Sequence, residues 1–342
     1  MKPIKRRYYV LAVSICLLAA AAIWAYYYVF STFSKSEGVA YVYIDSNDNI
    51  DSVYGKLEPV AQTHALGAFR LLANHYDYDE HIRTGRYAIS PESRTIDVFR
   101  QLRNGQQTPI MLTIPSVRTV DRMATVLGRQ LMVDSASIVR TLRDTLVLSS
   151  LGYDTCTVPA LFIPNTYEVY WNVSATSLLQ RMQREHDTFW NEERRQKAEA
   201  IGLTPVEVTT LASIVDEETA NDAEKPTIAG LYLNRLQRGM LLQADPTVKF
   251  ALKDFTLRRV LNRHLEVDNP YNTYKYAGLP PGPIRIPSVV GIDAVLNHAR
   301  HDYLYMCAKE DFSGTHNFAR TLQEHLQNAA RYTRALNQRG IR

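Results

Sequence analysis

The residues best suited to chemistry are three adjacent acids, Asp216, Glu217 and Glu218, which follow an apolar run with helical spacing. With Leu211 at 0° and an advance of about 100° per residue, Glu218 lies at about −20°, on the face of Leu211 and Val215. Asp216 and Glu217 fall at about 140° and about −120°, so we expect them to face water. A carboxyl group on an apolar face has a raised pKa unless it is paired, and a general acid needs that raised pKa. The pattern therefore makes Glu218 a candidate for a general acid.

Two other interpretations of Glu218 stay open from its spacing alone. The helix could end before this residue, or its carboxylate could form an ion pair with an arginine such as Arg235. A serine triad of Ser213, His316 and Asp245 is disfavoured, because Ser213 does not lie in a Gly-x-Ser-x-Gly turn.

Several blocks around Glu218 occur in an order typical of one known family. They are LASIVDEET at 211–219, LNRL at 233–236, GM at 239–240, LQADPTV at 242–248, YNTY at 271–274, GLPPGPI at 278–284, and HNF at 316–318 with His325 beyond. The chain thus resembles the YceG-like (MltG) endolytic murein transglycosylases, strongly over residues 108–342 and only in layout before them. By this resemblance Glu218 matches the family's catalytic glutamate, the last acid of Glu-x-Glu-Thr. Asp216 stands where the family commonly has Glu, and Asn165 where it often has an acid, so no charge-based role is assigned to Asn165.

The resemblance implies a lyase reaction on peptidoglycan, an endolytic cut of the MurNAc–GlcNAc bond in nascent glycan strands. Glu218 would act first as general acid on the glycosidic oxygen and then as base on the muramic 6-hydroxyl, which closes on C1 and leaves a 1,6-anhydro-MurNAc end. A tethered nucleophile needs no second base, so one carboxyl group suffices. No metal or cofactor is implied. Two alternatives are a water-using muramidase with Asp245 as the second carboxylate, and a non-catalytic, membrane-tethered scaffold that binds glycan.

Polar residues inside the matching blocks are candidates for holding the sugars, since amides, short acids and tyrosines bond hydroxyl and N-acetyl groups. They are Gln243, Asp245, Asn272, Tyr274 and His316. Other roles are open for three of them: Asp245 could form a turn with Pro246, Tyr274 could pack in the core, and His316 could satisfy a buried carbonyl.

The elements that must position these residues are marked by caps and breakers. Thr204-Pro205-Val206-Glu207 forms a capping box at the start of the helix that carries Glu218. A helix is predicted over 226–238, ending at Gly239, and a charged amphipathic helix over 176–200. The proline- and glycine-rich segment 271–287 predicts an ordered loop.

A smaller unit precedes this region. Strands are predicted at 39–44 and 85–89, and a helix follows each of them, over 50–57 and from a Thr95 cap to Gly105. By the resemblance, residues 39–107 correspond to the family's LysM-like domain, which binds glycan or serves only in packing. Residues 108–342, which open with a strand at 110–114 and a helix at 118–131, correspond to its catalytic domain. The fold class is α+β.

The N-terminus predicts a membrane anchor. Residues 8–30 contain no charge and no proline, and about 20 such residues cross a bilayer as a helix. Four basic residues at positions 2, 5, 6 and 7 precede the stretch and account for the whole net charge of +4, which argues against nucleic-acid binding. The positive-inside rule places residues 1–7 in the cytoplasm and everything after a linker at 31–38 outside, in the periplasm beside the inner membrane. A signal peptide cleaved near Ala22 is the alternative.

The remaining expectations concern partners and thiols. Peptidoglycan strands and the membrane are the expected partners, with peptidoglycan synthases as further candidates by the resemblance. Cys16, Cys156 and Cys307 form no metal-binding pattern, and Cys156 and Cys307 could pair in an oxidising space.

Overall fold

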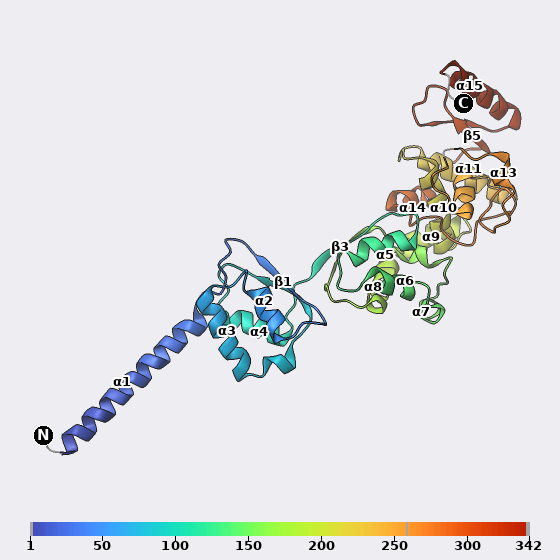
Figure 1. Ribbon diagram of the computed structural model, residues 1–342. Coiled ribbons are helices and arrows are strands. Elements are labelled where there is room, and N and C mark those ends of the chain that lie inside the picture. The colour runs from blue at the N-terminus through green and yellow to red at the C-terminus, as the bar shows by residue number, and fades with distance from the viewer. Residues whose placement is uncertain (1–2, 258, 340–342) are drawn as a thin grey trace. The chain divides into compact units, whose positions relative to one another are not determined.

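A computed structural model describes residues 3–257 and 259–339, as helices with three small two-stranded sheets (Figure 1). The predicted α+β class is confirmed. The chain forms two compact units: unit 1 extends to Met111 and includes Glu168–Val173, whereas unit 2 comprises Leu112–Tyr167 and the chain from Ser174 on.

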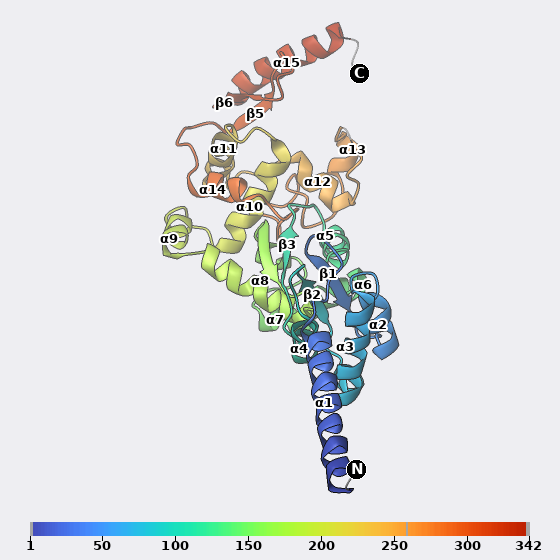
Figure 2. The same ribbon diagram turned by 90° about the vertical axis from the view of Figure 1, so that its left-hand side faces the viewer.

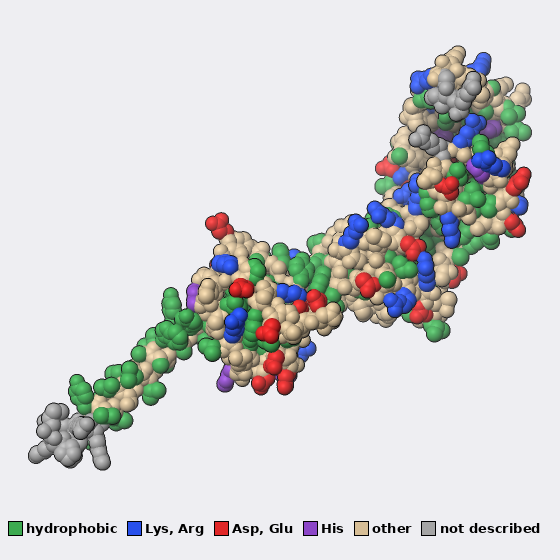
Figure 3. Space-filling model, viewed as in Figure 1, with side chains coloured by type: hydrophobic (Ala, Val, Ile, Leu, Met, Phe, Trp, Pro, Cys, Tyr) green, Lys and Arg blue, Asp and Glu red, His purple; other side chains and the backbone are tan. Residues whose placement is uncertain are grey.

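The N-terminal helix α1, Pro3–Phe30, contains the predicted apolar stretch. Its segment Tyr8–Phe30 is long and apolar enough to cross a membrane, and hydrophobic side chains cover its visible face in Figure 3. The C-terminal end of α1 packs against the helices of unit 1 (Figure 2).

Unit 1 is built on an antiparallel pair of strands, β1 (Ala40–Ile44) and β2 (Gly85–Ile89), with Val42 opposite Tyr87. Its helices are α2 (Ile50–Leu57), α3 (Thr63–His75), η1 (Tyr78–His81) and α4 (Thr95–Asn104). Both strands and the helices over 50–57 and 95–104 agree with the sequence prediction, whereas α3 was not predicted. Thr95 is not the cap of α4: Arg94 holds that position, and the buried Thr95 hydroxyl donates to Ser31 O.

The predicted linker at 31–38 is largely built into unit 1. Phe33 is fully buried and donates its backbone N–H to Ser93 O at 2.8 Å. Lys35 N donates to Val60 O, and Ser34 forms a β-bridge with Ala61. The interpretation of this segment as a simple polar link was therefore wrong, because an aromatic residue in its middle belongs to the core.

Strand β3, Ile110–Ile114, pairs with β4, Asn165–Val169, and each of these two strands is divided between the units. The helices of unit 2 form two groups. The first group of helices is α5 (Val120–Gly128), α6 (Ser135–Thr141), α7 (Thr145–Ser150), η2 (Val158–Leu161), α8 (Ala175–Phe189) and α9 (Glu192–Ala200). The single helix predicted over 176–200 is two helices, because Trp190 is buried between them and the Asn191 side chain caps α9.

The second group surrounds the helix that carries the three acids. It comprises α10 (Pro205–Glu218), α11 (Lys225–Gln237), α12 (Asp245–Leu252), α13 (Asn262–Leu265), α14 (Val289–Leu296), β5 (Tyr305–Ala308), β6 (His316–Ala319) and α15 (Leu322–Gln338). Strands β5 and β6 are antiparallel. The predicted loop at 271–287 contains no helix or strand, as expected.

Helix α10 is the centre of this group (Figure 2). The capping box predicted at its start is present, with the Thr204 hydroxyl accepting from Glu207 N and the Glu207 carboxylate accepting from Thr204 N. Every residue from Val208 to Val215 is buried, since α11 and α14 both pack against α10. A helix that is buried all round has no water-facing side on which to place the acids that follow.

Candidate active site

The first of the three acids, Asp216, is an internal structural anchor. Its side chain is 3% exposed and forms a salt bridge with Lys225 at 2.8 Å. It also accepts hydrogen bonds from the backbone N–H and the hydroxyl of Ser288, the N-cap of α14. A Cβ added at Gly291 would lie 2.6 Å from Asp216 Oδ1, so this approach requires a glycine. The expectation that Asp216 faces water was wrong.

The second acid, Glu217, is also buried and paired. Its side chain is 11% exposed and accepts from Arg118 Nε at 2.8 Å and from Arg285 Nη1 at 3.0 Å. Both arginines are far from Glu217 in the sequence, so the position of Glu217 around the helix could not reveal these contacts. The expectation that Glu217 faces water was wrong for the same reason as for Asp216: other segments of unit 2 cover the end of α10.

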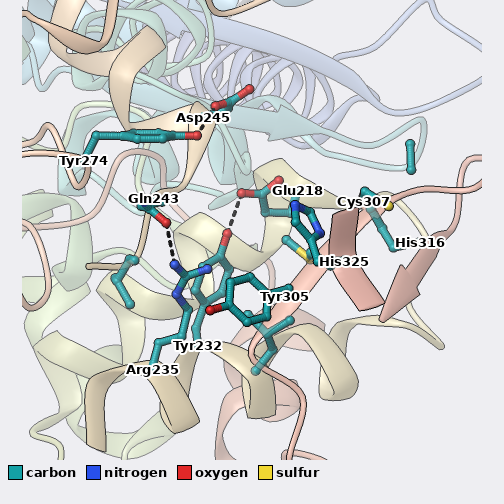
Figure 4. A pocket seen from close by; sticks show the side chains of 14 residues that line it. Glu218, Tyr232, Arg235, Gln243, Asp245, Tyr274, Tyr305, Cys307, His316 and His325 are labelled. Carbon is teal, nitrogen blue, oxygen red and sulfur yellow. Dashed lines mark hydrogen bonds between the residues drawn. The ribbon is translucent and has the colours of Figure 1, made fainter. Parts of the chain in front are cut away.

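The third acid, Glu218, faces a pocket of about 440 Å³ (Figure 4). Tyr232 on α11 donates its hydroxyl proton to Glu218 Oε1 at 2.6 Å. Burial, with a smaller contribution from the charge of Asp245, raises the pKa of Glu218 to about 7, although the Tyr232 hydrogen bond and the charge of Lys249 both act to lower it. Glu218 forms no salt bridge within the described residues. Both open alternatives are thus answered: α10 includes Glu218, and its carboxyl is not paired with Arg235.

Arg235 instead lies at the side of the pocket as a buried cation, 7% exposed. It donates to the carbonyl oxygens of Leu241 and Leu304 and, at 2.6 Å, to Gln243 Oε1. Since a guanidinium group only donates, the Gln243 oxygen must face it, and the Gln243 amide N–H groups are left for other partners. Gln243 itself lines the pocket and has a left-handed backbone, with φ of +52°.

Three of the other predicted sugar-binding residues also line the pocket: Asp245, Tyr274 and His316. The Tyr274 hydroxyl donates to Asp245 Oδ1 at 2.6 Å, and burial followed by this hydrogen bond raises the pKa of Tyr274. His316 donates its backbone N–H to Glu224 at 2.7 Å, and its Nδ1 lies 2.9 Å from the other oxygen of that carboxylate.

The prediction for Asn272 is not supported by its position. Asn272 is fully buried and is not among the residues that line the pocket. Its amide donates to the carbonyl oxygens of Leu265 and Val267 and accepts from Tyr274 N. Asn272 therefore fixes the loop that presents Tyr274, and its own polar atoms are used within the protein.

Comparison with known proteins adds to this geometry. Residues 42–331 match the YceG-like family. The chain belongs to the YceG-like family. It is 25% identical to an endolytic murein transglycosylase of Streptococcus pneumoniae (strain D39), over 94% of this chain and 64% of the relative. It is 41% identical to an endolytic murein transglycosylase of Bacillus subtilis (strain 168), over 38% of this chain and 35% of the relative. The chain thus spans less than two thirds of the length of these curated relatives.

A solved structure supports the fold assignment. The crystal structure of a YceG-like protein from Listeria monocytogenes aligns with a TM-score of 0.55 and 26% identity, covering 85% of this chain and 99% of that one. The predicted resemblance to this family is confirmed.

Sequence reasoning missed several residues of the pocket in this YceG-like protein. Tyr232 immediately precedes the matching block 233–236, but nothing in its spacing connects it with Glu218. Tyr305 and His325 stack with their ring centroids 5.4 Å apart, and burial together with the charge of Arg235 lowers the pKa of His325. His325 was noted only as part of the family pattern, and Tyr305 was not noted at all.

The structure also bears on the serine triad and on the cysteine pair. The Ser213 hydroxyl donates to Thr210 O and accepts from Ile284 N, so it is not aligned with His316 or Asp245 as a triad would require. Cys156 and Cys307 are both free thiols in this structure.

Proposed function

We propose that this YceG-like protein is an endolytic lytic transglycosylase that cuts the MurNAc–GlcNAc bond of peptidoglycan strands and leaves 1,6-anhydro-MurNAc ends. The observation that carries the proposal is Glu218, a carboxyl group with a pKa raised to about 7 that faces a pocket large enough for sugars. The name printed for the pneumococcal and Bacillus relatives, endolytic murein transglycosylase, supports the substrate class.

The hydrogen bond from Tyr232 assigns different tasks to the two oxygens of Glu218. Oε1 accepts from Tyr232, so the acidic proton resides on Oε2, which is left for the glycosidic oxygen. When that proton has moved, the Tyr232 bond stabilises the carboxylate, which is then the base for the muramic 6-hydroxyl. The 6-hydroxyl attacks C1 within the same sugar, so no water and no second carboxylate are needed.

In this proposal the sugars contact Gln243, Asp245, Tyr274 and His316. The Gln243 amide offers N–H groups to a carbonyl or hydroxyl oxygen, and His316 is oriented by the buried Glu224 carboxylate. Asn272 is retained only as a positioning residue for Tyr274. The water-using alternative assigns Asp245 as the second carboxylate, and its pairing with Tyr274 leaves one Asp245 oxygen for that role.

We also propose the location. The apolar helix α1 anchors the protein in the inner membrane, with its N-terminus in the cytoplasm and both units in the periplasm beside nascent strands. Unit 1 is proposed as the LysM-like module that holds glycan, and peptidoglycan synthases as partners that supply the strands.

Mass analysis of the fragments released from purified, uncrosslinked glycan strands tests the reaction. We expect anhydro ends, which are about 18 Da lighter than the reducing ends that a water-using muramidase leaves. Glu218→Gln protein is the matched control and should release neither product. Reducing ends from the wild type would refute the intramolecular step, and no fragments at all would favour the non-catalytic scaffold.

A further inference from the structure

Unit 2 contains a second hollow, of about 230 Å³, outside the Glu218 pocket, which we call the α12 hollow. Three aromatic side chains form one wall: Phe250 lies 4.7 Å from Tyr271 and 6.3 Å from Phe255 between ring centroids. Arg118 lies over Phe255 at 5.6 Å, and Lys253 stands at the end of helix α12. The hollow therefore combines an apolar wall with cations.

Helix α12 contributes to both the Glu218 pocket and the α12 hollow, since Asp245 lines the first and Phe250 the second. A smaller hollow of about 30 Å³ shares Phe250 and Phe255 with it and is also lined by Glu217 and Pro246. These last two residues are the chain neighbours of Glu218 and Asp245, which line the large pocket. Helix α12 thus borders all three spaces, and its eight residues extend about 12 Å at about 1.5 Å each.

Some of the charged side chains that line these two hollows have a salt-bridge partner and others do not. Glu217 holds Arg118, and Arg143 holds Asp121. Lys249 and Lys253, which line the small hollow and the α12 hollow, have no salt-bridge partner among the residues described.

Lys253 is unusual in its backbone as well as in its charge. It has a left-handed φ of +55° at the C-terminal end of α12, a position that glycine fills without strain. A side chain at such a position costs about 1 kcal/mol or more. Backbone strain of this kind is concentrated at functional sites, where a particular side chain is needed.

We propose that the α12 hollow binds the peptide carried by the muramic acid whose bond is cut, with Lys249 and Lys253 receiving its carboxylates. This inference rests on the proposed function. A neutral sugar would use the aromatic wall but not the two lysines, whereas a peptide of small residues and carboxylates uses both. An extended chain of three to four residues spans about 12 Å, so a peptide attached to a sugar in the Glu218 pocket reaches Lys253.

The test compares glycan strands that carry their peptides with the same strands after an amidase has removed them. The variant is Lys253→Gly in the full-length protein, because glycine relieves the left-handed position and keeps the fold. Lys249 is left in place, because its charge lowers the pKa of Glu218. KM should rise about fivefold on peptide-bearing strands, with kcat unchanged and no effect on stripped strands. Lys197→Gln is the matched control, because Lys197 is a partly exposed lysine on α9 that is paired with Glu193 and lies outside both hollows.

Each other outcome contradicts the inference in a recognisable way. An equal rise of KM on both substrates would mean that the hollow holds sugar, and no change on peptide-bearing strands would mean that it holds no part of the substrate. The same comparison of Kd, made in the Glu218→Gln background, tests peptide binding without turnover. If the wild type releases no fragments, the proposed function is refuted, and the Kd comparison still tests whether the α12 hollow binds the peptide.

Discussion

The hydrogen bond from Tyr232 to Glu218 should influence the pH at which the enzyme works, and Tyr232→Phe tests this by removing only the hydroxyl oxygen. A hydrogen bond to a charged group contributes about 1.5–3 kcal/mol, and one pKa unit corresponds to about 1.4 kcal/mol. Tyr232→Phe should therefore raise the pKa of Glu218 from about 7 to about 8–9. Because the proposed reaction begins with protonated Glu218, the alkaline limb of kcat/KM should move up by about one to two units.

A weaker acid also transfers its proton more slowly, so the plateau of the Tyr232→Phe profile should fall about three- to tenfold. The assay is the rate of fragment release from uncrosslinked strands, measured from pH 5 to pH 10. Tyr274→Phe is the matched control, because it removes a tyrosine hydroxyl that lines the same pocket and bonds Asp245, and leaves the Glu218 hydrogen bond intact. An alkaline limb that stays in place in Tyr232→Phe, or moves equally in Tyr274→Phe, would refute this account of Glu218.

Four further predictions follow from the same contacts. Glu218→Gln should reduce the rate about 10²- to 10⁴-fold. The same variant should change stability, because folded wild-type protein keeps the Glu218 proton up to about pH 7, whereas the unfolded chain loses it above about pH 4.5, so the wild type loses stability between these two values. Thermal unfolding at pH 8 should therefore show the variant to be more stable by up to about 3 kcal/mol. Asp245→Asn should lower the pKa of Glu218 and move the alkaline limb down while most of kcat remains, whereas a loss of 10²-fold or more would support the water-using mechanism. Gln243→Glu should raise Tm through its ion pair with Arg235 and raise KM about tenfold, because no amide N–H remains to donate, and an unchanged KM would remove Gln243 from the substrate site. Full-length protein should stay in the membrane fraction after high-salt washing, and a soluble form lacking residues 8–30 would contradict the anchor.

Local signals in the sequence were sufficient where the cause is local. The start of α10 was predicted correctly, because a capping box and a proline at the first turn act within four residues. The predicted helix also extends to Glu218, which is the last residue of α10. A local signal was also available at Asn191, whose side chain caps α9, but the continuous charged pattern on both sides concealed the break.

Non-local packing accounts for what the sequence could not show. The helical angle placed Asp216 and Glu217 in water, yet Arg285, Lys225 and Ser288 reach them from other segments of unit 2. The same limit applies to Asn272, because residue type and spacing do not tell whether an amide faces a ligand or the backbone of its own loop. Such contacts follow from the tertiary fold, whereas an isolated helix leaves these groups exposed.

The burial of Phe33 directly after α1 changes how the anchor is understood mechanically. A flexible tether holds a domain near a surface by raising its effective concentration there, with free choice of height and tilt. Here the chain leaves the helix and enters the core of unit 1 within three residues, since Ser31 O accepts from Thr95 N and Phe33 is enclosed. In the proposed anchor no flexible tether separates α1 from unit 1, so the tilt of α1 in the bilayer would set the direction in which unit 1 points.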